Sequence, residues 1–295
     1  MDPETALAIF KGGIVLGALY ALMATGLSLV WTTLGIFNFA HGAFIALGAY
    51  VAWQFSSSDA MALPILPAVF FTCFVMFAVG GIIYFLLVKP FERRADVVLI
   101  AVITTLAGSA IIENGLLLIW GPRAKQIQPF LSGELELAGI RLAMSEILLL
   151  CLVLIILLGI GLFLRYTRPG RAMRAVAQNR ESAQLLGLDV PRLYAIAFGL
   201  SALTAGLAGS FVGTIRFMNP AMGAEPLMKA LIVVIFGGVA RFSSPIYAAF
   251  VIGLLEAFSI YAFGLYWAPA VLFFTMIVVL LVKPEGLFGR YQRTL

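Results

Sequence analysis

Long apolar runs separated by short polar stretches cover most of this chain. A run of about 20 apolar residues is the length at which one α-helix crosses a lipid bilayer. The alternating apolar and polar positions typical of the strands of a membrane barrel are not found in the sequence. The pattern therefore predicts an all-α polytopic membrane protein, a helical bundle of about eight to ten transmembrane segments, some of them discontinuous. The apolar segments lie at 9–30, 36–55, 63–88, 97–120, 145–165, 193–214, 227–239, 245–264 and 268–282.

The segment at 227–239 differs from the others because it is too short to cross a bilayer by itself. It is either a half-helix or a helix that extends back into 215–226. The composition agrees with a membrane protein, since 62% of the residues are hydrophobic, 11% are charged and the mean hydropathy is +1.07. Asp2 and Glu4 precede the first apolar run, whereas a cleaved signal peptide begins with cations. The first run is therefore expected to remain as a membrane helix.

Cationic residues set the expected orientation, because cytoplasmic loops carry an excess of Lys and Arg. These loops explain the net charge of +5 without a nucleic-acid partner. We expect the N-terminus outside and the C-terminus in the cytoplasm. One membrane domain over 1–295 is expected, since no loop is long enough for an ATPase and no GxxxxGK[ST] stretch occurs. The expected cytoplasmic cations are Lys89, Arg93, Arg94, Arg165, Arg168, Arg171, Arg174, Arg180, Arg192, Arg241, Lys283, Arg290 and Arg293, and the outer ones are Lys11, Arg123, Lys125, Arg141, Arg216 and Lys229.

A cationic polar loop, 166–192, separates two of the apolar segments. After a break at Pro169, one amphipathic helix is expected over 171–186, ended by Gly187 in the left-handed conformation. Asp189 is then expected to cap the next membrane helix. Because both flanking segments are apolar, this loop is where the chain meets water and another protein.

The expected loop helix has one apolar face, formed by Met173, Val176, Ala183 and Leu186. A cationic amphipathic helix either lies on the lipid surface or fits a groove on a soluble subunit. This face is small and contains neither Trp nor Phe, which favours the protein groove.

Several stretches are similar to one known family. Glu181-Ser182-Ala183, followed after three residues by Gly187, resembles the EAA-xxx-G pattern in the coupling helix of ABC-importer permeases, with Ser182 in place of an Ala. The other similar stretches are GALYAL at 17–22, NFAHG at 38–42, ALGAY at 46–50 and KPEGLFG at 283–289. Together they resemble the LivH-type permeases of branched-chain amino acid importers over nearly the whole chain.

The resemblance implies one subunit of a larger transporter in the bacterial inner (plasma) membrane. A sister permease would form a heterodimer with it, two cytoplasmic ABC ATPases would bind the loop 166–192, and a periplasmic binding protein would deliver substrate. ATP and Mg would be bound by the ATPases, so neither a cofactor nor an enzymatic activity is expected of this chain. Membrane lipid is a further expected partner. The implied coupling residues are Met173, Arg174, Val176, Gln178, Asn179, Arg180, Glu181, Ser182, Ala183, Leu186 and Gly187.

The charged residues of this loop have a second interpretation. A solvated helix face or contact with phospholipid headgroups would equally explain exposed arginines beside a membrane span. The two interpretations are evenly balanced for Arg174, whereas contact with an ATPase is favoured for Glu181.

Polar residues inside apolar segments are functional candidates, because buried charge is costly in a membrane. Structural hydrogen bonding is the alternative for each. The interrupted stretches 35–48 and 213–238 are the expected pathway-lining elements, since broken helices often mark the pathway of a transporter. A metal site is not expected, because His41 is the only histidine. The pathway candidates are Asn38, His41, Glu113, Asn114, Asn219 and Glu256.

Three classes of function follow. The first is an ABC-importer permease coupled to its ATPases through 171–187. The second is an ion-coupled secondary transporter, which usually needs paired intramembrane charges, and only Glu113 and Glu256 are available. A membrane-embedded enzyme ranks last because no HExxH or GxSxG stretch occurs. The expected substrates are leucine, isoleucine and valine, with urea or a short amide as the alternative that the resemblance does not exclude.

Overall fold

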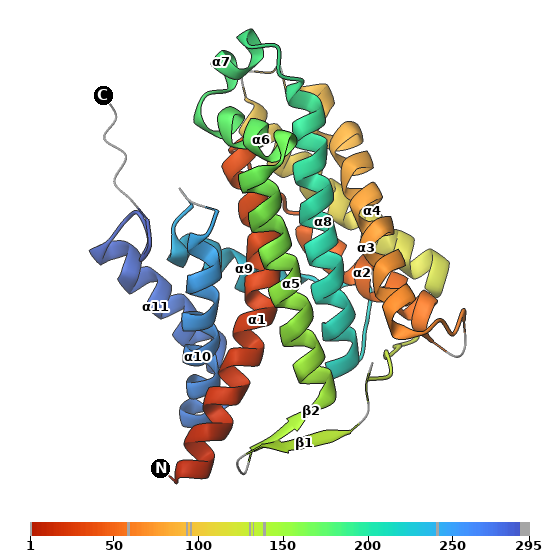
Figure 1. Cartoon of the computed structure of the whole chain (residues 1–295), viewed down its shortest axis with the longest axis vertical. Helices are drawn as coiled ribbons and strands as arrows, with labels where there is room; N and C mark the ends of the chain where they lie inside the picture. Colours follow the sequence, from red (N-terminus) through yellow and green to blue (C-terminus); the bar gives the residue numbers. More distant parts are fainter. Residues whose placement is uncertain are drawn as a thin grey trace. The chain divides into compact units, whose positions relative to one another are not determined.

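The computed structural model describes residues 2–57, 60–92, 94, 96–129, 131, 133–137, 140–239 and 242–289. Within these ranges the regular structure is helical apart from one short hairpin (Figure 1). This confirms the predicted all-α polytopic class. The elements in chain order are α1 (Pro3–Leu34), α2 (His41–Ser56), α3 (Ile65–Ile83), η1 (Tyr84–Val88), η2 (Lys89–Phe91), α4 (Val97–Trp120), β1 (Glu134–Leu137), β2 (Ile140–Ala143), α5 (Met144–Tyr166), α6 (Arg168–Gln178), α7 (Arg180–Leu185), α8 (Val190–Ile215), α9 (Ala224–Gly237), α10 (Ser244–Phe263) and α11 (Ala268–Val282).

Every predicted apolar segment is helical, but the helices differ in length. In the described part of the chain, six are long and apolar enough to cross a membrane, namely α1, α3 with its continuation to Phe91, α4, α5, α8 and α10. Helices α2, α9 and α11 contain only 16, 14 and 15 residues. The predicted total of about eight to ten segments is reached only if these shorter helices are counted. Each of them is shorter than the about 20 residues with which a helix crosses a bilayer.

The chain divides into two compact units that alternate along the sequence. The first unit contains Met1–Ser28, Leu131–Ile155 and Met228–Leu295, and the second contains Leu29–Phe130 and Ile156–Leu227. Helices α1, α5 and α9 each begin in one unit and end in the other. The single domain over 1–295 remains a prediction.

In the second unit, α8 packs backbone to backbone against both α2 and α3. A Cβ atom on Gly48 of α2 would overlap the backbone of Gly206, and one on Gly209 would overlap the carbonyl oxygen of Ile45. A Cβ on Gly80 of α3 would likewise overlap the backbone of α8. Small residues allow such close approach where the hydrophobic effect does not drive helices together. The glycines of α8 thus serve helix packing, as their helical spacing indicates.

In the first unit, α1 and α10 also pack closely at glycine residues. A Cβ on Gly253 of α10 would overlap the backbone of Gly17. After α11 the chain returns to the end of α9, where the Leu287 N–H donates to the Phe236 carbonyl at 2.7 Å. Gly238 (φ +92°) and Gly286 (φ +80°) face each other at this contact, in a conformation that favours glycine. The KPEGLFG stretch therefore fixes the end of α9.

The predicted segment 63–88 is not one regular helix. After α3, residues Tyr84–Val88 form a π-turn and Lys89–Phe91 a 3-10 turn. Pro90 cannot donate a backbone hydrogen bond, which favours the end of the helix there. π-turns are frequent at functional sites, and this one leads directly to Glu92.

The long loop 121–144 contains structure that the hydrophobic pattern did not predict. Strands β1 and β2 pair antiparallel, with Glu134 opposite Ala143. Each strand has four residues, which is too short for a clear alternation of apolar and polar positions.

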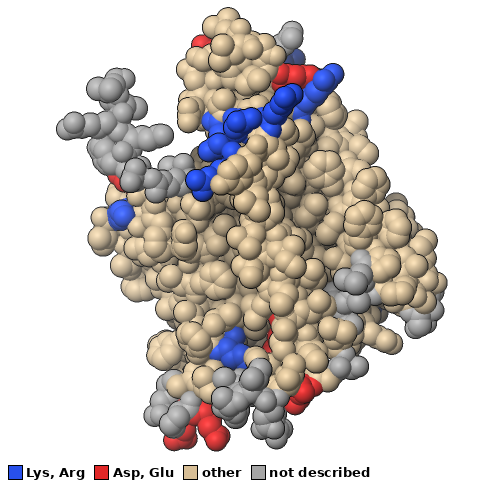
Figure 2. Space-filling view, viewed as in Figure 1, with Lys and Arg blue, Asp and Glu red and all other residues tan. Residues whose placement is uncertain are grey.

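Charge is sparse over most of the face seen in Figure 2, where Lys and Arg gather over α6 and the adjoining end of α5. Arg93, Arg241, Arg290 and Arg293, which we predict to be cytoplasmic, lie outside the described residues. The sides of the membrane on which the two termini lie remain predictions.

Candidate functional site

The cationic loop 166–192 forms two short helices, α6 and α7, in place of the predicted single helix. Helix α6 begins at Arg168, because the Gly170 N–H donates to Thr167 Oγ1 at 3.1 Å and so caps the helix. Pro169 lies in this first turn, where a backbone N–H would have no acceptor within the helix. Pro169 was expected to precede the helix, but it is part of its first turn.

Asn179 separates the two helices. Its backbone is extended, with φ −155° and ψ 108°, and its Oδ1 accepts a hydrogen bond from the Ser182 N–H at 2.9 Å. The prediction of one continuous helix over 171–186 is therefore wrong, because a capping Asn begins a new helix inside the apolar pattern. The predicted ends are confirmed, with Gly187 at φ +78° and Asp189 accepting from the Arg192 N–H at 3.3 Å.

The predicted apolar docking face is largely turned toward the chain itself. Met173, Val176 and Ala183 are buried, with only 2–3% of their surface exposed, and both α6 and α7 pack on α8. By contrast, Leu186 is 81% exposed and the neighbouring Leu185 is 89% exposed. The exposed apolar residues here are Leu185, the last residue of α7, and Leu186, which follows it. A role of Met173, Val176 and Ala183 in coupling remains a prediction.

The remaining predicted coupling residues divide between solvent and internal contacts. The side chains of Arg174, Gln178, Glu181 and Ser182 belong to exposed residues. Arg174 donates to the carbonyl of Arg165 at 3.4 Å, which directs its side chain toward the end of α5. Arg180, in contrast, forms an ion pair within the chain.

Arg180 is bound by residues of its own chain. Its Nη2 lies 3.2 Å from Oε2 of Glu92, which follows η2. The other oxygen of Glu92 accepts a hydrogen bond from the hydroxyl of Tyr84, the first residue of the π-turn. The Arg180 guanidinium also lies 5.5 Å from the ring centroid of Tyr194 on α8. We refer to Tyr84, Glu92, Arg180 and Tyr194 as the Glu92 cluster.

The Glu92 cluster joins the start of α7 to the end of α3 and to α8. Only 9% of the Glu92 side chain is exposed, so its charge depends on Arg180 and Tyr84 for compensation. Our sequence analysis identified Arg180 but missed Glu92 and Tyr84. Residues 88 positions apart carry no local pattern that pairs them.

His41 and Asn38 lie where the backbone is irregular inside the second unit. Helix α2 begins only at His41, and the buried Asn38 precedes it, accepting from the Ala40 N–H at 3.1 Å. Nδ1 of His41 lies 3.1 Å from Oγ of Ser201, which is near the middle of α8. Because α8 is long enough to cross a membrane, the contact of His41 with the middle of α8 places the start of α2 near the middle of that span. The predicted start of this helix at residue 36 is too early.

The second interrupted stretch meets the first in the same unit. Between the end of α8 at Ile215 and the start of α9 at Ala224 the chain is not helical. A Cβ on Gly223 would overlap the carbonyl oxygen of Gly42. Irregular backbone at membrane depth occurs where it lines a cavity or is buried in protein. The two stretches predicted to line a pathway are thus in contact.

Glu113, Asn114 and Asn219 do not join this group. Glu113 accepts from Ser109 Oγ at 3.1 Å, and the exposed Asn114 donates to the Ala110 carbonyl at 2.8 Å, both within α4. Asn219 is exposed.

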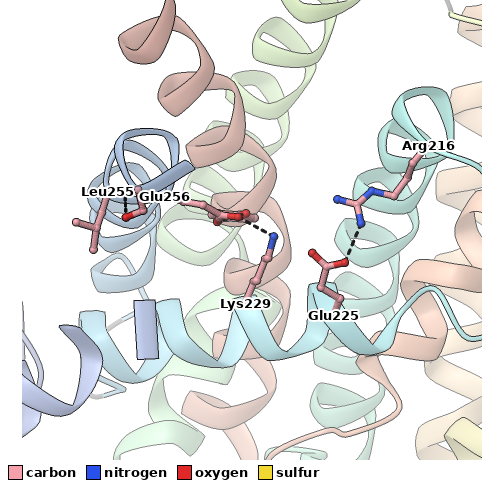
Figure 3. Close-up of polar contacts among 7 residues, drawn as sticks. Arg216, Glu225, Lys229, Leu255 and Glu256 are labelled. Carbon is pink, nitrogen blue, oxygen red and sulfur yellow. Dashed lines mark hydrogen bonds and ion pairs between the residues drawn. The ribbon is translucent and has the colours of Figure 1, made fainter. Parts of the chain in front are cut away.

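Glu256 belongs to a buried polar cluster in the first unit (Figure 3). Its Oε1 lies 2.8 Å from Nζ of Lys229 on α9, and its Oε2 accepts from the hydroxyl of Tyr20 on α1. The side chains of Lys229 and Glu256 are 13% and 3% exposed. Lys229, which we expected among the outer cations, is therefore inside the protein, because a buried carboxylate needs an opposite charge.

A separate ion pair belongs to the second unit. Arg216 Nη1 lies 2.8 Å from Glu225 Oε2 at the start of α9, and both side chains are about half exposed (Figure 3). Exposed ion pairs contribute little to stability, so this contact adds little to the stability of the fold. In the part of the chain that the structure describes, no group of three His, Cys, Asp or Glu could hold a metal ion.

Comparison with known proteins gives a consistent result. Residues 9–280 match the family described as branched-chain amino acid transport system / permease component. The high-affinity branched-chain amino acid transport system permease proteins BraD of Pseudomonas aeruginosa and LivH of Escherichia coli are 29% and 28% identical, each over 94% of both chains. A probable branched-chain amino acid transport permease protein LivH of Methanocaldococcus jannaschii is 30% identical, over 95% of this chain and 92% of its own. No solved structure matches the chain significantly.

Proposed function

The chain belongs to the family of branched-chain amino acid transport system permease components, and we propose that it is the transmembrane permease subunit of an ABC importer for leucine, isoleucine and valine. The observation that carries the proposal is similarity over almost the full length to relatives named for this transport. Within the described residues, no feature favours urea or a short amide.

The proposal includes partners and a location. A sister permease completes the pathway, two cytoplasmic ATPases bind and hydrolyse ATP with Mg, and a periplasmic protein delivers substrate. The complex lies in the bacterial inner membrane. The support for this division of labour is the family and the six helices that could span a membrane.

The ATPase contact in this proposal is α7 and the turn that follows it. Leu185 and Leu186 supply the apolar surface that enters a groove on the ATPase, and Glu181 supplies a charged contact at the start of α7. This assignment is supported by exposure, since two neighbouring leucines protrude from an otherwise polar loop.

The Glu92 cluster transmits the motion in this account. When the ATPases move α7, the ion pair of Arg180 with Glu92 pulls the end of α3, and the contact with Tyr194 moves α8. Rigid-body displacement of packed helices is a common way to convert a local event into a change of access. The π-turn at Tyr84 supplies the irregular point at which α3 can adjust.

The pathway in this account runs beside the contact between Gly42 and Gly223. Two non-helical stretches meet there, next to the buried His41 and Ser201. Glu256 is a poor candidate for binding a coupling ion, because its two carboxylate oxygens are already bound by Lys229 and by Tyr20.

Site-specific photo-cross-linking tests the ATPase contact. A photoreactive residue at Leu186 should form an adduct with the ATPase in membranes that contain the assembled transporter. The matched control is Val176, which lies in the same loop but is buried. Cross-linking from Val176 and none from Leu186 would contradict the assignment of this contact.

A further inference from the structure

We propose that α6 and the end of α5 form a binding surface for anionic phospholipid headgroups. The surface consists of Arg165, Arg168, Arg171 and Arg174, which we call the arginine stripe. This inference does not depend on the transported substrate or on which side of the membrane the loop lies.

The first observation is that α6 folds back against the span from which it emerges. A Cβ on Gly170 of α6 would overlap the carbonyl oxygen of Phe163, and it would lie 2.6 Å from Cα of Leu164. Both residues are in the last turn of α5, a helix long and apolar enough to cross a membrane. Helix α6 therefore lies at the depth where a span meets the headgroups.

The second observation is the direction in which the stripe faces. At about 100° per residue, Arg168, Arg171 and Arg174 share one side of α6. The buried Met173 and Val176 occupy the opposite side, which packs on α8. The hydrogen bond from Arg174 to the Arg165 carbonyl brings the end of α5 into the same surface. Lys and Arg gather over this region in Figure 2.

The third observation is that the stripe has no carboxylate of its own. Among the described residues, no Asp or Glu forms an ion pair with any of the four arginines, although Arg180 and Arg192 in the same loop each have one. These four exposed cations on neighbouring turns create a positive potential that attracts an anion, although salt screens it. Guanidinium groups bind phosphate through two parallel hydrogen bonds, which suits a phospholipid headgroup.

Lipid is a better occupant than a soluble protein because of what surrounds the stripe. The adjoining α5 surface is apolar, with Leu158 and Leu162 57% and 56% exposed, as expected where acyl chains are in contact. Tyr166, the last residue of α5, is 64% exposed, and its ring centroid lies 5.4 Å from the Arg165 guanidinium. Aromatic residues are enriched at membrane interfaces. The exposed leucines proposed for the ATPase lie on the other side of the Asn179 break.

Fluorescence quenching measures this binding locally. Tyr166→Cys is labelled with bimane in the full chain, in which Cys73 and Cys151 are replaced by Ala. The chain is reconstituted into phosphatidylcholine nanodiscs that contain either headgroup-spin-labelled phosphatidylglycerol or the same label on phosphatidylcholine. Phosphatidylglycerol should quench at several-fold lower mole fraction. Arg171→Gln should weaken its apparent affinity by about fivefold, which corresponds to about 1 kcal/mol for one arginine near an anionic surface.

Two variants make the result specific. Arg171→Lys retains the charge and should keep most of the preference for phosphatidylglycerol. Arg192→Gln removes an exposed arginine of the same loop that is paired with Asp189, and it should leave the preference unchanged. Equal quenching by the two lipids in the parent chain, or equal losses in Arg171→Gln and Arg192→Gln, would overturn the proposal. Arg171 is exposed, so its substitution leaves the packing of α6 intact.

Discussion

At the scale of single residues, two buried carboxylates of this protein are each held by a cation and a tyrosine hydroxyl. Glu256 is compensated by Lys229 and Tyr20, and Glu92 by Arg180 and Tyr84. Sequence analysis found one member of each pair as a functional candidate. It could not find the partner, because pairing depends on which helices pack together, and helix packing is not encoded in any local pattern.

The Lys229–Glu256 pair gives a prediction for stability. Lys229→Met leaves the Glu256 carboxylate buried without a cation and should lower the free energy of unfolding by about 3–5 kcal/mol. The double variant Lys229→Met/Glu256→Leu replaces both charges by apolar groups and should recover most of that loss. Unfolding in SDS mixed micelles, followed by circular dichroism, measures both. A double variant as unstable as Lys229→Met would show that the loss does not arise from an uncompensated charge.

At the scale of elements, the sequence predicted the positions of the membrane helices well, but it predicted the structure of the cationic loop 166–192 poorly. A run of about 20 apolar residues has few alternatives to a helix in a membrane. The polar loop 166–192 could adopt many structures in water, and the capping hydrogen bond of Asn179 decides between one helix and two. The irregular starts of α2 and α9 were predicted as interruptions, but their contact through Gly42 and Gly223 was not.

The coupling role of the Glu92 cluster gives a prediction at this scale. Glu92→Gln weakens the ion pair that joins α7 to the end of α3. The variant should still assemble and hydrolyse ATP, but it should transport several-fold less leucine per ATP hydrolysed, because motion of α7 no longer moves α3. The measurement is the ratio of uptake to hydrolysis in proteoliposomes.

The matched control is Asp189→Asn, which removes a carboxylate from an exposed ion pair in the same loop. Its ratio of uptake to hydrolysis should equal that of the parent. A parent-like ratio in Glu92→Gln as well would assign the Glu92 cluster to stability alone.

At the scale of the whole molecule, three contacts agree with the predicted orientation. The pairs Glu92 with Arg180 and Phe236 with Leu287 each join two stretches on the predicted cytoplasmic side. The bridge between Lys125 and Met218 joins two stretches on the predicted outer side. Each contact lies within one unit, so the agreement does not depend on how the units are arranged.

Labelling of two exposed glutamines tests the orientation. Gln126 lies in a predicted outer loop and Gln184 on α7 in the predicted cytoplasmic loop. In intact cells a membrane-impermeant maleimide that crosses only the outer membrane should label Gln126→Cys and leave Gln184→Cys unlabelled until the inner membrane is permeabilised. The reverse pattern would place loop 166–192 outside and exclude a cytoplasmic ATPase as its partner.

We infer that this chain is the passage of an ATP-driven importer. Uptake of radiolabelled leucine is measured in proteoliposomes that contain this chain, its sister permease and the ATPases, with the binding protein outside and ATP inside. We expect uptake that requires all components and is abolished by Leu185→Asp/Leu186→Asp, which places two charges on the proposed ATPase contact. Uptake by this chain alone, driven by an ion gradient and unaffected by that variant, would contradict the account.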